Sequence, residues 1–384
     1  MRKMKVLVAL GTRPEVIKLA PVIMEMRRRP GRFRPILVST GQHGFLLRQM
    51  LRAFGLEPDH ELRVMQANQS LEVLTGRVLR RFSALLEKTR PDLVMVQGDT
   101  TTAMACGLSA FYRRIPVVHV EAGLRTDDVY RPFPEEVNRR IITQVASHHF
   151  APTRGAAANL LRQGVPRGRV LVTGNTVVDA VRWAAKNVSA AIPPSVEQAL
   201  AGKPKLILVT VHRRESFGRP LLQICGALRA IAQNHPDALL VYPVHPNPNV
   251  RRRVHERLDG VERIVLTRPL DYFAFLSLLK RAHLVLTDSG GVQEEAPSFR
   301  VPVLVLREVT ERPEGVAAGV AKVVGMDAGA IVRETGRLLL DRRARDRMRK
   351  AANPYGDGRA SRRIADCLSR LPLTQLFSIA NPAP

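Results

Sequence analysis

The stretch LVLTDSGGVQEEAP, residues 284–297, joins an apolar run to a helix-compatible segment through a glycine-rich turn. An apolar run that ends in such a turn and continues as a helix is typical of a strand–helix unit. One interpretation of the turn is purely structural: Ser289 is the N-cap, and the glutamate pair compensates the helix dipole. The other is an anion site, because free N–H groups at a helix start attract phosphate and glycines let the backbone approach it.

The same pattern of an apolar run followed by an amphipathic segment recurs along the chain. Leu71–Glu87 illustrates the segments, with apolar positions three and four residues apart. Buried runs separated by helices indicate parallel sheets covered on both faces, so we predict an α/β protein. The predicted strands are Lys5–Leu10, Pro35–Ser39, Leu93–Gln97, Pro116–Val120, His149–Ala151, Val170–Val172, Leu206–Thr210, Leu239–Tyr242, Arg263–Leu266, Leu284–Thr287 and Val303–Leu306.

A Pro- and Ala-rich stretch, residues 187–205, separates two sets of strands and predicts a nearby domain boundary. Doubly wound domains bind ligands at the carboxyl ends of their strands. We therefore expect two such domains, with the active site in the cleft between them.

The composition is that of a soluble globular chain of about two domains: 384 residues, 45% hydrophobic and 24% charged. No apolar run approaches the roughly 20 residues that span a bilayer, and the N-terminus reads as a first strand rather than a signal peptide. The three cysteines are far apart, which favours a reducing cytoplasm and no zinc site. We predict a cytoplasmic protein without a membrane partner.

The formal net charge is +26, with arginine runs at residues 27–29, 251–253 and 342–349. Nucleic-acid binding and an anionic substrate are two explanations, and a solvated arginine-rich surface is the third. Aromatic residues make up only 5% of the chain, which offers little stacking surface for single strands. No nucleic-acid-binding motif is present, so we predict no nucleic-acid partner.

Polar residues gather where the predicted strands end. The segment Gly11–Pro21 follows the first strand, and Pro14 suits the first turn of a helix. Arg13 and Lys18 can therefore both contact a phosphate at this helix start. The alternative is that Lys18 is an ordinary solvated residue.

Three carboxylates and a histidine occupy similar positions later in the chain. Asp99 and Glu121 follow apolar strands, Pro134 sets up a helix that begins at Glu135, and His212 ends another strand. Helix capping by Asp99, and ion pairs of either glutamate with Arg125 or Arg139, are the structural alternatives. Together at strand ends, these groups indicate acid–base chemistry.

These motifs resemble those of a known enzyme family. GTRPE–K, GDTTT, VEAGLRT, PEE–NR, HRRESFG, TDSGG–QEEAP, TERPE and NPYGDG occur in the order found in the non-hydrolysing UDP-N-acetylglucosamine 2-epimerases. The resemblance runs from Lys5 to about Arg370. Any one motif is weak evidence, but eight in order are highly specific.

The resemblance implies a GT-B-like fold of two doubly wound Rossmann-type domains. The first covers residues 1–172 and is joined by a C-terminal helix at about 356–380; the UDP-binding second covers residues 173–355. It further implies a homodimer that interconverts UDP-GlcNAc and UDP-ManNAc without NAD or metal. LGTRPE is indeed not the GxGxxG fingerprint of dinucleotide binding.

The resemblance also implies roles for individual residues. The catalytic set is Asp99, Glu121, Glu135 and His212. The substrate-binding set is Arg13, Lys18, Phe275, Ser289, Gly290, Gly291, Glu295 and Arg312, with the serine and glycines cradling the diphosphate and Glu295 meeting the ribose.

Some relatives have an additional, allosteric UDP-GlcNAc site, and Gln42, His43, Gln69 and His245 match it here. Asn68 stands where some members have arginine, so activation by substrate stays open. A relative that acts on a different sugar, a hydrolysing branch and a GT-B glycosyltransferase are the alternatives; the transferase would not require the acidic set.

Overall fold

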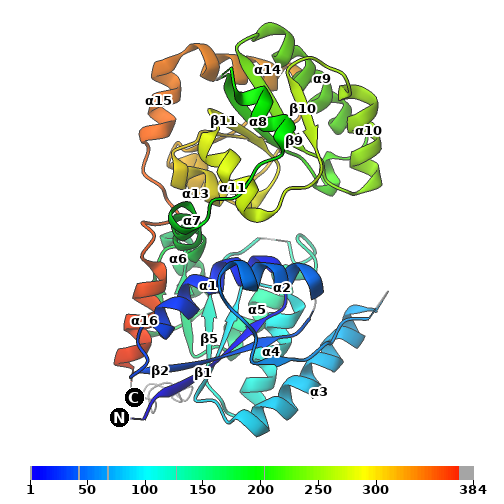
Figure 1. Ribbon diagram of the computed structural model, residues 1–384. Coiled ribbons are helices and arrows are strands. Elements are labelled where there is room, and N and C mark those ends of the chain that lie inside the picture. Colours follow the sequence, from blue (N-terminus) through cyan, green and yellow to red (C-terminus); the bar gives the residue numbers. More distant parts are fainter. Residues whose placement is uncertain (1, 42–43, 67–68, 127, 203, 372–384) are drawn as a thin grey trace. The chain divides into compact units, whose positions relative to one another are not determined.

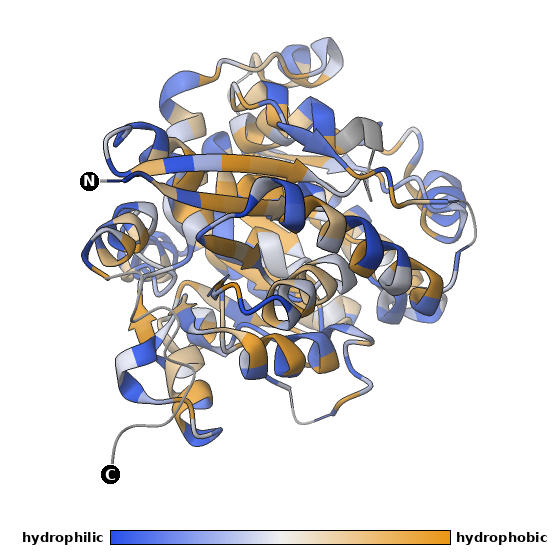
Figure 2. Ribbon diagram, turned by 90° about the horizontal axis from the view of Figure 1, so that it is seen from below, coloured by the Kyte–Doolittle hydropathy of each residue, from blue (hydrophilic) through white to orange (hydrophobic). Residues whose placement is uncertain are grey.

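A computed structural model describes residues 2–371 except 42–43, 67–68, 127 and 203. Strands and helices alternate along this part of the chain, as Figure 1 shows. The strands are apolar on both faces: in β1 (Met4–Leu10) only Lys5 is not buried. In Figure 2 most strand ribbons are hydrophobic, whereas helix ribbons alternate between the two colours. That contrast is expected for parallel sheets with helices on both faces.

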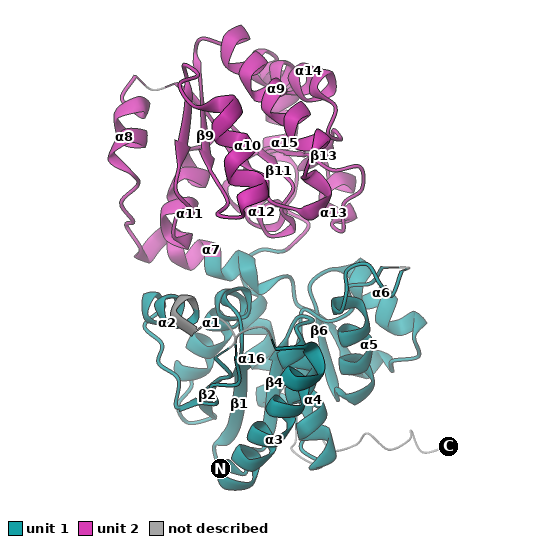
Figure 3. Cartoon of the chain, turned by 90° about the vertical axis from the view of Figure 1, so that its right-hand side faces the viewer, with its two compact units in different colours: residues 1–180, 356–384 teal, residues 181–355 magenta. Residues whose placement is uncertain are grey.

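The chain forms two compact units, residues 1–180 with 356–384 and residues 181–355 (Figure 3). Unit 1 contains a seven-stranded parallel sheet in the order β3-β2-β1-β4-β5-β6-β7. Its other strands are β2 (Phe33–Ser39), β3 (His60–Glu61), β4 (Leu93–Gln97), β5 (Val117–Val120), β6 (His148–Ala151) and β7 (Val170–Val172). Its helices are α1 (Arg13–Arg27), α2 (Gly44–Ala53), α3 (Leu71–Thr89), α4 (Thr101–Tyr112), α5 (Glu135–Val145), α6 (Arg154–Arg162), the first part of α7 (Thr176–Asn187) and α16 (Ala360–Arg370).

Unit 2 contains a six-stranded parallel sheet in the order β10-β9-β8-β11-β12-β13. The strands are β8 (Lys205–Thr210), β9 (Ala238–Pro243), β10 (Ile264–Thr267), β11 (Leu284–Thr287), β12 (Val303–Val305) and β13 (Ala321–Val323). The helices are α8 (Pro194–Leu200), α9 (Arg219–Asn234), α10 (Pro248–Leu258), α11 (Tyr272–Arg281), α12 (Gly290–Glu295), α13 (Pro313–Ala317), α14 (Ala328–Leu340) and α15 (Arg342–Lys350).

Each sheet reverses its strand order at one point. In unit 1 the chain turns back between β1 and β4, and in unit 2 between β8 and β11. Loops that leave adjacent strands in opposite directions open a crevice at the carboxyl ends, where doubly wound sheets bind ligands. The loops after β4, β8 and β11 carry Asp99, His212 and Ser289, and Arg13 begins the helix after β1, so the topology gathers these four predicted site residues at two switch points, one in each unit.

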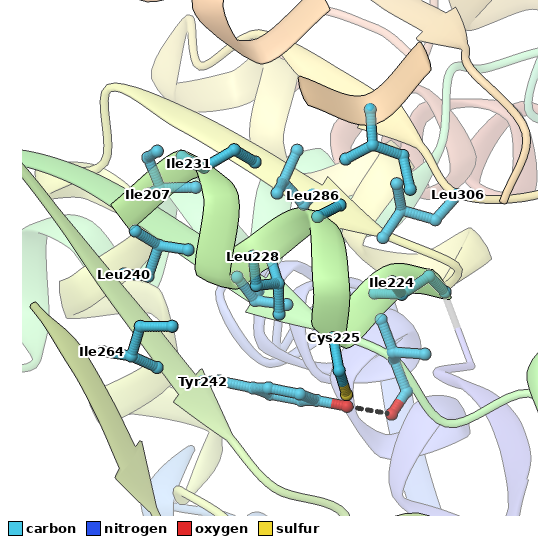
Figure 4. Close-up of a cluster of buried hydrophobic side chains, with 14 of the residues drawn as sticks. Ile207, Ile224, Cys225, Leu228, Ile231, Leu240, Tyr242, Ile264, Leu286 and Leu306 are labelled. Carbon is cyan, nitrogen blue, oxygen red and sulfur yellow. Dashed lines mark hydrogen bonds between the residues drawn. The ribbon is translucent and has the colours of Figure 1, made fainter. Parts of the chain in front are cut away.

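The core of unit 2 lies between its sheet and helix α9 (Figure 4). Leu228 and Ile231 of α9 pack in one buried cluster with Leu240 and Leu286 from the strands. Tyr242 is fully buried in the same cluster, and its hydroxyl donates to the carbonyl of Val211 at 3.0 Å. The core thus holds the backbone directly before the loop that bears His212.

The α/β fold class predicted from the sequence is confirmed, and each predicted strand is present with ends shifted by at most two residues. Two strands were missed. Residues 60–61 are polar and form a two-residue edge strand, and residues 321–323 form a three-residue edge strand interrupted by Lys322. Neither has the apolar run that signals a buried strand. The predicted helix at Leu71 extends to Thr89, two residues beyond its expected end.

The C-terminal helix α16 returns to unit 1, where it packs against α1. Asp179 accepts from the backbone N–H groups of Ala360 and Ser361, at 3.1 and 2.9 Å, and so caps the start of α16. The chain passes from unit 1 to unit 2 within α7, after residue 180, and returns to unit 1 between residues 355 and 356. The domain limits predicted at 172/173 and 356–380 remain predictions, and residues 372–380 lie outside the described part of the chain.

Over the described residues, no helix combines the length and the apolar character needed to cross a bilayer. In the same part of the chain, no three His, Cys, Asp or Glu side chains are grouped so that they could hold a metal ion. All three cysteines are free thiols.

Candidate active site

Glu121 directly follows β5 and is held in an unusual backbone conformation. Its φ is 63°, in the left-handed region that a non-glycine residue rarely adopts. The side chain is buried, Lys18 Nζ lies 2.6 Å from both carboxylate oxygens, and Gln97 donates a further hydrogen bond. Such strain persists only where the surroundings impose it, and it concentrates at functional sites.

Asp99 lies in the loop after β4 and pairs with Arg139, whose Nη2 is 2.7 Å from its carboxylate. The loop backbone is held from two sides. Asn138 donates to the Asp99 carbonyl at 2.9 Å, and His119 Nε2 lies 2.7 Å from the carbonyl of Gly98. Burial lowers the pKa of His119 to about 4, so the ring is neutral at pH 7 and its one proton lies on Nε2, where the carbonyl accepts it.

Helix α5 begins with two glutamates in different environments. Glu136 is fully buried and pairs with Arg139 and Arg140, at 3.2 and 2.8 Å, while it accepts from the Thr126 backbone N–H. Glu135 is half-buried, and its Oε2 is shielded from water without a hydrogen-bond partner among the described residues. The ion pair considered for Glu135 from the sequence is thus made by its neighbour.

A buried carboxylate joins the first two polar loops of unit 1. Glu15 accepts from the backbone N–H groups of Gly11 and Thr12, completing a capping box, and from Thr100 Oγ1 at 2.8 Å. Burial raises the pKa of Glu15, although these hydrogen bonds oppose the rise. Arg13 is therefore presented from a helix start that is tied to the Asp99 loop.

In unit 2, His212 follows β8 and faces a buried carboxylate. Its Nδ1 lies 3.6 Å from Asp288 Oδ1, and its ring stacks on His245 with centroids 5.4 Å apart. Burial lowers the pKa of His212, and the Asp288 carboxylate opposes that shift.

Two arginines converge over Gly290 at the start of α12. A Cβ placed on this glycine would lie 3.7 Å from Arg213 Nη2 and 3.8 Å from Arg312 Cζ. Arg312 Nε donates to buried Glu294, whereas Arg213 Nε is shielded from water without a hydrogen-bond partner among the described residues. Guanidinium groups beside a close-approach glycine are suited to an anion with several oxygens, such as a phosphate.

The sequence-based interpretation that the glutamate pair compensates the α12 dipole is wrong. Both glutamates lie in the last turn of this six-residue helix, and none of its first-turn residues is acidic. Ser289 occupies the N-cap position but makes no side-chain capping hydrogen bond.

Comparison with known proteins agrees with this arrangement. The profile of the UDP-N-acetylglucosamine 2-epimerase family matches residues 24–369. A UDP-N-acetylglucosamine 2-epimerase of Yersinia pestis is 47% identical over 378 residues, 97% of this chain and 100% of the relative. The chain belongs to the UDP-N-acetylglucosamine 2-epimerase family. Its predicted membership is confirmed.

Two further relatives support the assignment to the epimerase family. The enzyme of the same name from Escherichia coli strain K12 is 48% identical over 371 residues, 95% of this chain and 98% of the relative. The crystal structure of the UDP-GlcNAc 2-epimerase from Neisseria meningitidis, bound to UDP-GlcNAc, is 40% identical with a TM-score of 0.85, covering 95% of this chain and 99% of that one. The predicted GT-B-like class is shared with such structures.

Most residues predicted for the epimerase site lie at the carboxyl edges of the two sheets. Unit 1 carries Arg13, Lys18, Asp99, Glu121 and Glu135; unit 2 carries His212, Ser289, Gly290, Gly291, Glu295 and Arg312, with Phe275 half-buried in α11. Lys18 is not an ordinary solvated residue, because its side chain is 12% exposed and paired with Glu121.

Of the four residues predicted for an allosteric site, the structure describes two, one in each unit. His245 stacks on His212 in unit 2, whereas Gln69 lies in unit 1, where its amide contacts the Met65 sulfur at 2.9 Å. Gln42 and His43 lie outside the described residues.

Several side chains that lie against the predicted site residues were not assigned a site role from the sequence. They are Gln97, Arg213, Asp288 and Glu294, together with Arg139, which was considered only as an ion-pair partner. All lie in or beside the motifs at strand ends, but their partners are far away in the sequence, so no local pattern identifies them.

Gly290→Ala tests the anion site of unit 2. The added methyl group would make ordinary contacts with the guanidinium groups, and alanine favours helix, so we expect folding to be retained. The methyl group would occupy the approach path of a phosphate, so we expect UDP affinity, measured by calorimetry, to fall at least about tenfold, or about 1.4 kcal/mol. Gly226→Ala is the control, because this helical glycine of the same unit faces open space. Unchanged UDP affinity in Gly290→Ala would exclude phosphate from this position.

Proposed function

We propose that this protein interconverts UDP-GlcNAc and UDP-ManNAc without hydrolysis, by anti elimination of UDP to 2-acetamidoglucal and syn re-addition. The observation that carries the proposal is the strained, buried Glu121, which pairs with Lys18 and follows β5, the strand beside the one that leads into the Asp99 loop. The Neisseria meningitidis relative, whose structure contains UDP-GlcNAc, supports the choice of substrate.

The chemistry explains why several carboxylates are needed. The hydrogen on carbon 2 of the sugar is not acidic, so the carbon 1–oxygen bond to UDP breaks as a carboxylate removes that proton. The electrons of the carbon 2–hydrogen bond then form the double bond of the glucal. In the return step a proton reaches the opposite face of carbon 2, and a UDP oxygen adds to carbon 1 again. Proton transfer at two faces requires at least two acid–base groups.

Unit 1 supplies the acid–base groups in this proposal. Asp99, Glu121 and Glu135 share the proton transfers and the stabilisation of positive charge that develops near carbon 1. Lys18 holds Glu121 in place, as their 2.6 Å contacts suggest. Arg13, at the start of α1, contacts the substrate.

Unit 2 supplies the nucleotide contacts in this proposal. Ser289, Gly290 and Gly291 approach the diphosphate, and Arg213 and Arg312 offset its charge, since their guanidinium groups already meet beside Gly290. Glu295 accepts from the ribose hydroxyls and Phe275 contacts the uracil. His212 stabilises the departing diphosphate or relays its proton.

The remaining expectations belong to the same proposal. The reaction requires neither NAD nor metal. The enzyme is a cytoplasmic homodimer that supplies ManNAc units for cell-surface polysaccharide. Activation by the substrate would use Gln42, His43, Gln69 and His245. This part of the proposal is left open, because Asn68 stands where some relatives have arginine.

Incubation with UDP-GlcNAc in deuterated water tests the function. The proposed mechanism takes the carbon 2 proton from one face and returns one from solvent to the other. We therefore expect NMR to show UDP-ManNAc with deuterium at carbon 2, together with traces of UDP and 2-acetamidoglucal.

Other products would identify the alternatives. Free ManNAc and UDP would indicate a hydrolysing enzyme, and unlabelled carbon 2 without an acceptor would fit a glycosyltransferase. Hydrogen retained at carbon 2 of an epimerised product would exclude the solvent-exchanging mechanism. If nothing reacts, UDP-sugars with other substituents are the next substrates to test.

A further inference from the structure

The carboxylate of Asp288 connects the two loops at the switch point of unit 2. Asp288 follows β11, is fully buried, and lies beside the end of β8, where Thr210 pairs with Thr287. Its Oδ2 accepts from the backbone N–H groups of His212 and Arg213, both at 2.8 Å, and from Ser216 Oγ at 2.9 Å. One carboxylate oxygen thus holds the loop that bears His212.

The other oxygen of the same carboxylate has no such role. Oδ1 is shielded from water and has no hydrogen-bond partner among the described residues. His212 Nδ1, at 3.6 Å, forms an ion pair with it if the ring is protonated. This distance is too long for a hydrogen bond, but catalytic contacts often shorten when a ligand binds. A buried oxygen without a partner is costly, so a donor at Nδ1 is strongly favoured.

We propose that Asp288 is a positioning residue that keeps neutral His212 in the tautomer with hydrogen on Nδ1, so that Nε2 is the nitrogen available to the substrate. The inference deepens the proposed function, on which it rests for the role of His212. The opposite tautomer would set a nitrogen lone pair against a carboxylate oxygen, and the two would repel each other.

The surroundings of His212 make its tautomer important. Burial, Arg213 of the same loop and His245 of the loop after β9 all lower the pKa of His212, and the Asp288 carboxylate raises it. The ring is therefore mainly neutral at pH 7. A neutral ring with hydrogen on Nδ1 can take a proton from solvent at Nε2 and then donate that proton to a departing diphosphate oxygen. Tyr242, which holds the Val211 carbonyl, keeps this backbone in place.

If Asp288 only held the loop, Asp288→Asn would leave the tautomer of His212 unchanged. Holding the loop requires only the oxygen that accepts three hydrogen bonds, and an amide oxygen can do the same. In Asp288→Asn we expect that oxygen to stay with its three donors, so the amide nitrogen would face Nδ1. The amide would then donate to Nδ1 and stabilise the opposite tautomer.

The test is ¹⁵N NMR of the full-length protein with labelled histidine, with the His212 signals assigned from His212→Gln. In the wild type we expect neutral His212 to carry its hydrogen on Nδ1. In Asp288→Asn we expect the hydrogen to move to Nε2 and the pKa of His212 to fall further. Ser216→Ala is the control: it removes a donor to Oδ2 but keeps the charge, so the wild-type tautomer should remain. Hydrogen on Nε2 in the wild type, or an unchanged tautomer in Asp288→Asn, would overturn the proposal.

Activity separates this inference from the proposed function. Asp288→Asn should lower kcat by roughly 10–100-fold, the range for residues that orient a reacting group, and leave KM within about threefold. A loss of kcat/KM of the same size that came from KM alone would indicate only a loosened loop and would count against the inference. A wild type without epimerase activity that still shows the expected tautomers would refute the proposed function and leave the Asp288–His212 coupling standing. The wild-type spectrum decides the tautomer even if Asp288→Asn does not fold.

Discussion

Glu121→Gln should lower kcat/KM for UDP-GlcNAc epimerisation by roughly 10²–10⁴-fold, the usual contribution of a positioned acid–base group. Glutamine keeps the shape of the side chain and can still contact Gln97, but it cannot remove a proton from carbon 2. It also leaves the half-buried Lys18 without its carboxylate partner, which adds to the loss. The measurement is initial rates with both UDP-sugars.

The proposed nucleotide contacts lie in unit 2, so UDP affinity should change by less than about threefold in the same variant. Glu87→Gln is the matched control, because Glu87 also pairs with a basic side chain of unit 1, Arg113 at 2.6 Å, but is 63% exposed. We expect its activity to equal that of the wild type. Wild-type turnover in Glu121→Gln would remove Glu121 from the mechanism.

Leu228→Ala should lower the free energy of unfolding of unit 2 by about 2–5 kcal/mol. Leu228 is fully buried between α9 and the sheet (Figure 4), so truncation removes apolar contacts and leaves a cavity that the surrounding strands can fill only in part. Urea unfolding followed by circular dichroism measures the change.

Leu340→Ala is the control for this truncation. Leu340 belongs to the same unit and is 75% exposed, so we expect a change within about 0.5 kcal/mol. Equal effects of the two substitutions would contradict the packing described for α9. Because β8 and β11 belong to the same core, we also expect Leu228→Ala to weaken UDP binding once the temperature approaches the lowered midpoint.

Local sequence signals were sufficient for much of the fold. Apolar runs predicted all the strands that have buried cores, and Pro134 precedes α5 as predicted. Helix caps were less readable, because Thr100 rather than Asp99 caps α4. These features depend on residues within about four positions of one another, where side-chain chemistry and backbone geometry are directly linked.

Features that depend on tertiary contacts were not readable in this way. The edge strands β3 and β13 have two and three residues and exist because a neighbouring strand offers a hydrogen-bonding edge. The glutamate pair of the opening motif was assigned to the wrong end of its helix. The start of α12 was expected correctly, but its six-residue length was not.

The sequence by itself thus determined the class of the fold, the strands with buried cores and the family, and it placed the acidic residues after strands. Only the tertiary structure decided which of those residues meet. Lys18 pairs with Glu121 across 103 positions because the sheet of unit 1 has the strand order β1-β4-β5. Asp288 holds the His212 backbone across 76 positions because β8 lies beside β11. Contacts between loops so far apart in the chain follow from the order of the strands in the sheet. The hydrophobic periodicity of the sequence does not predict that order.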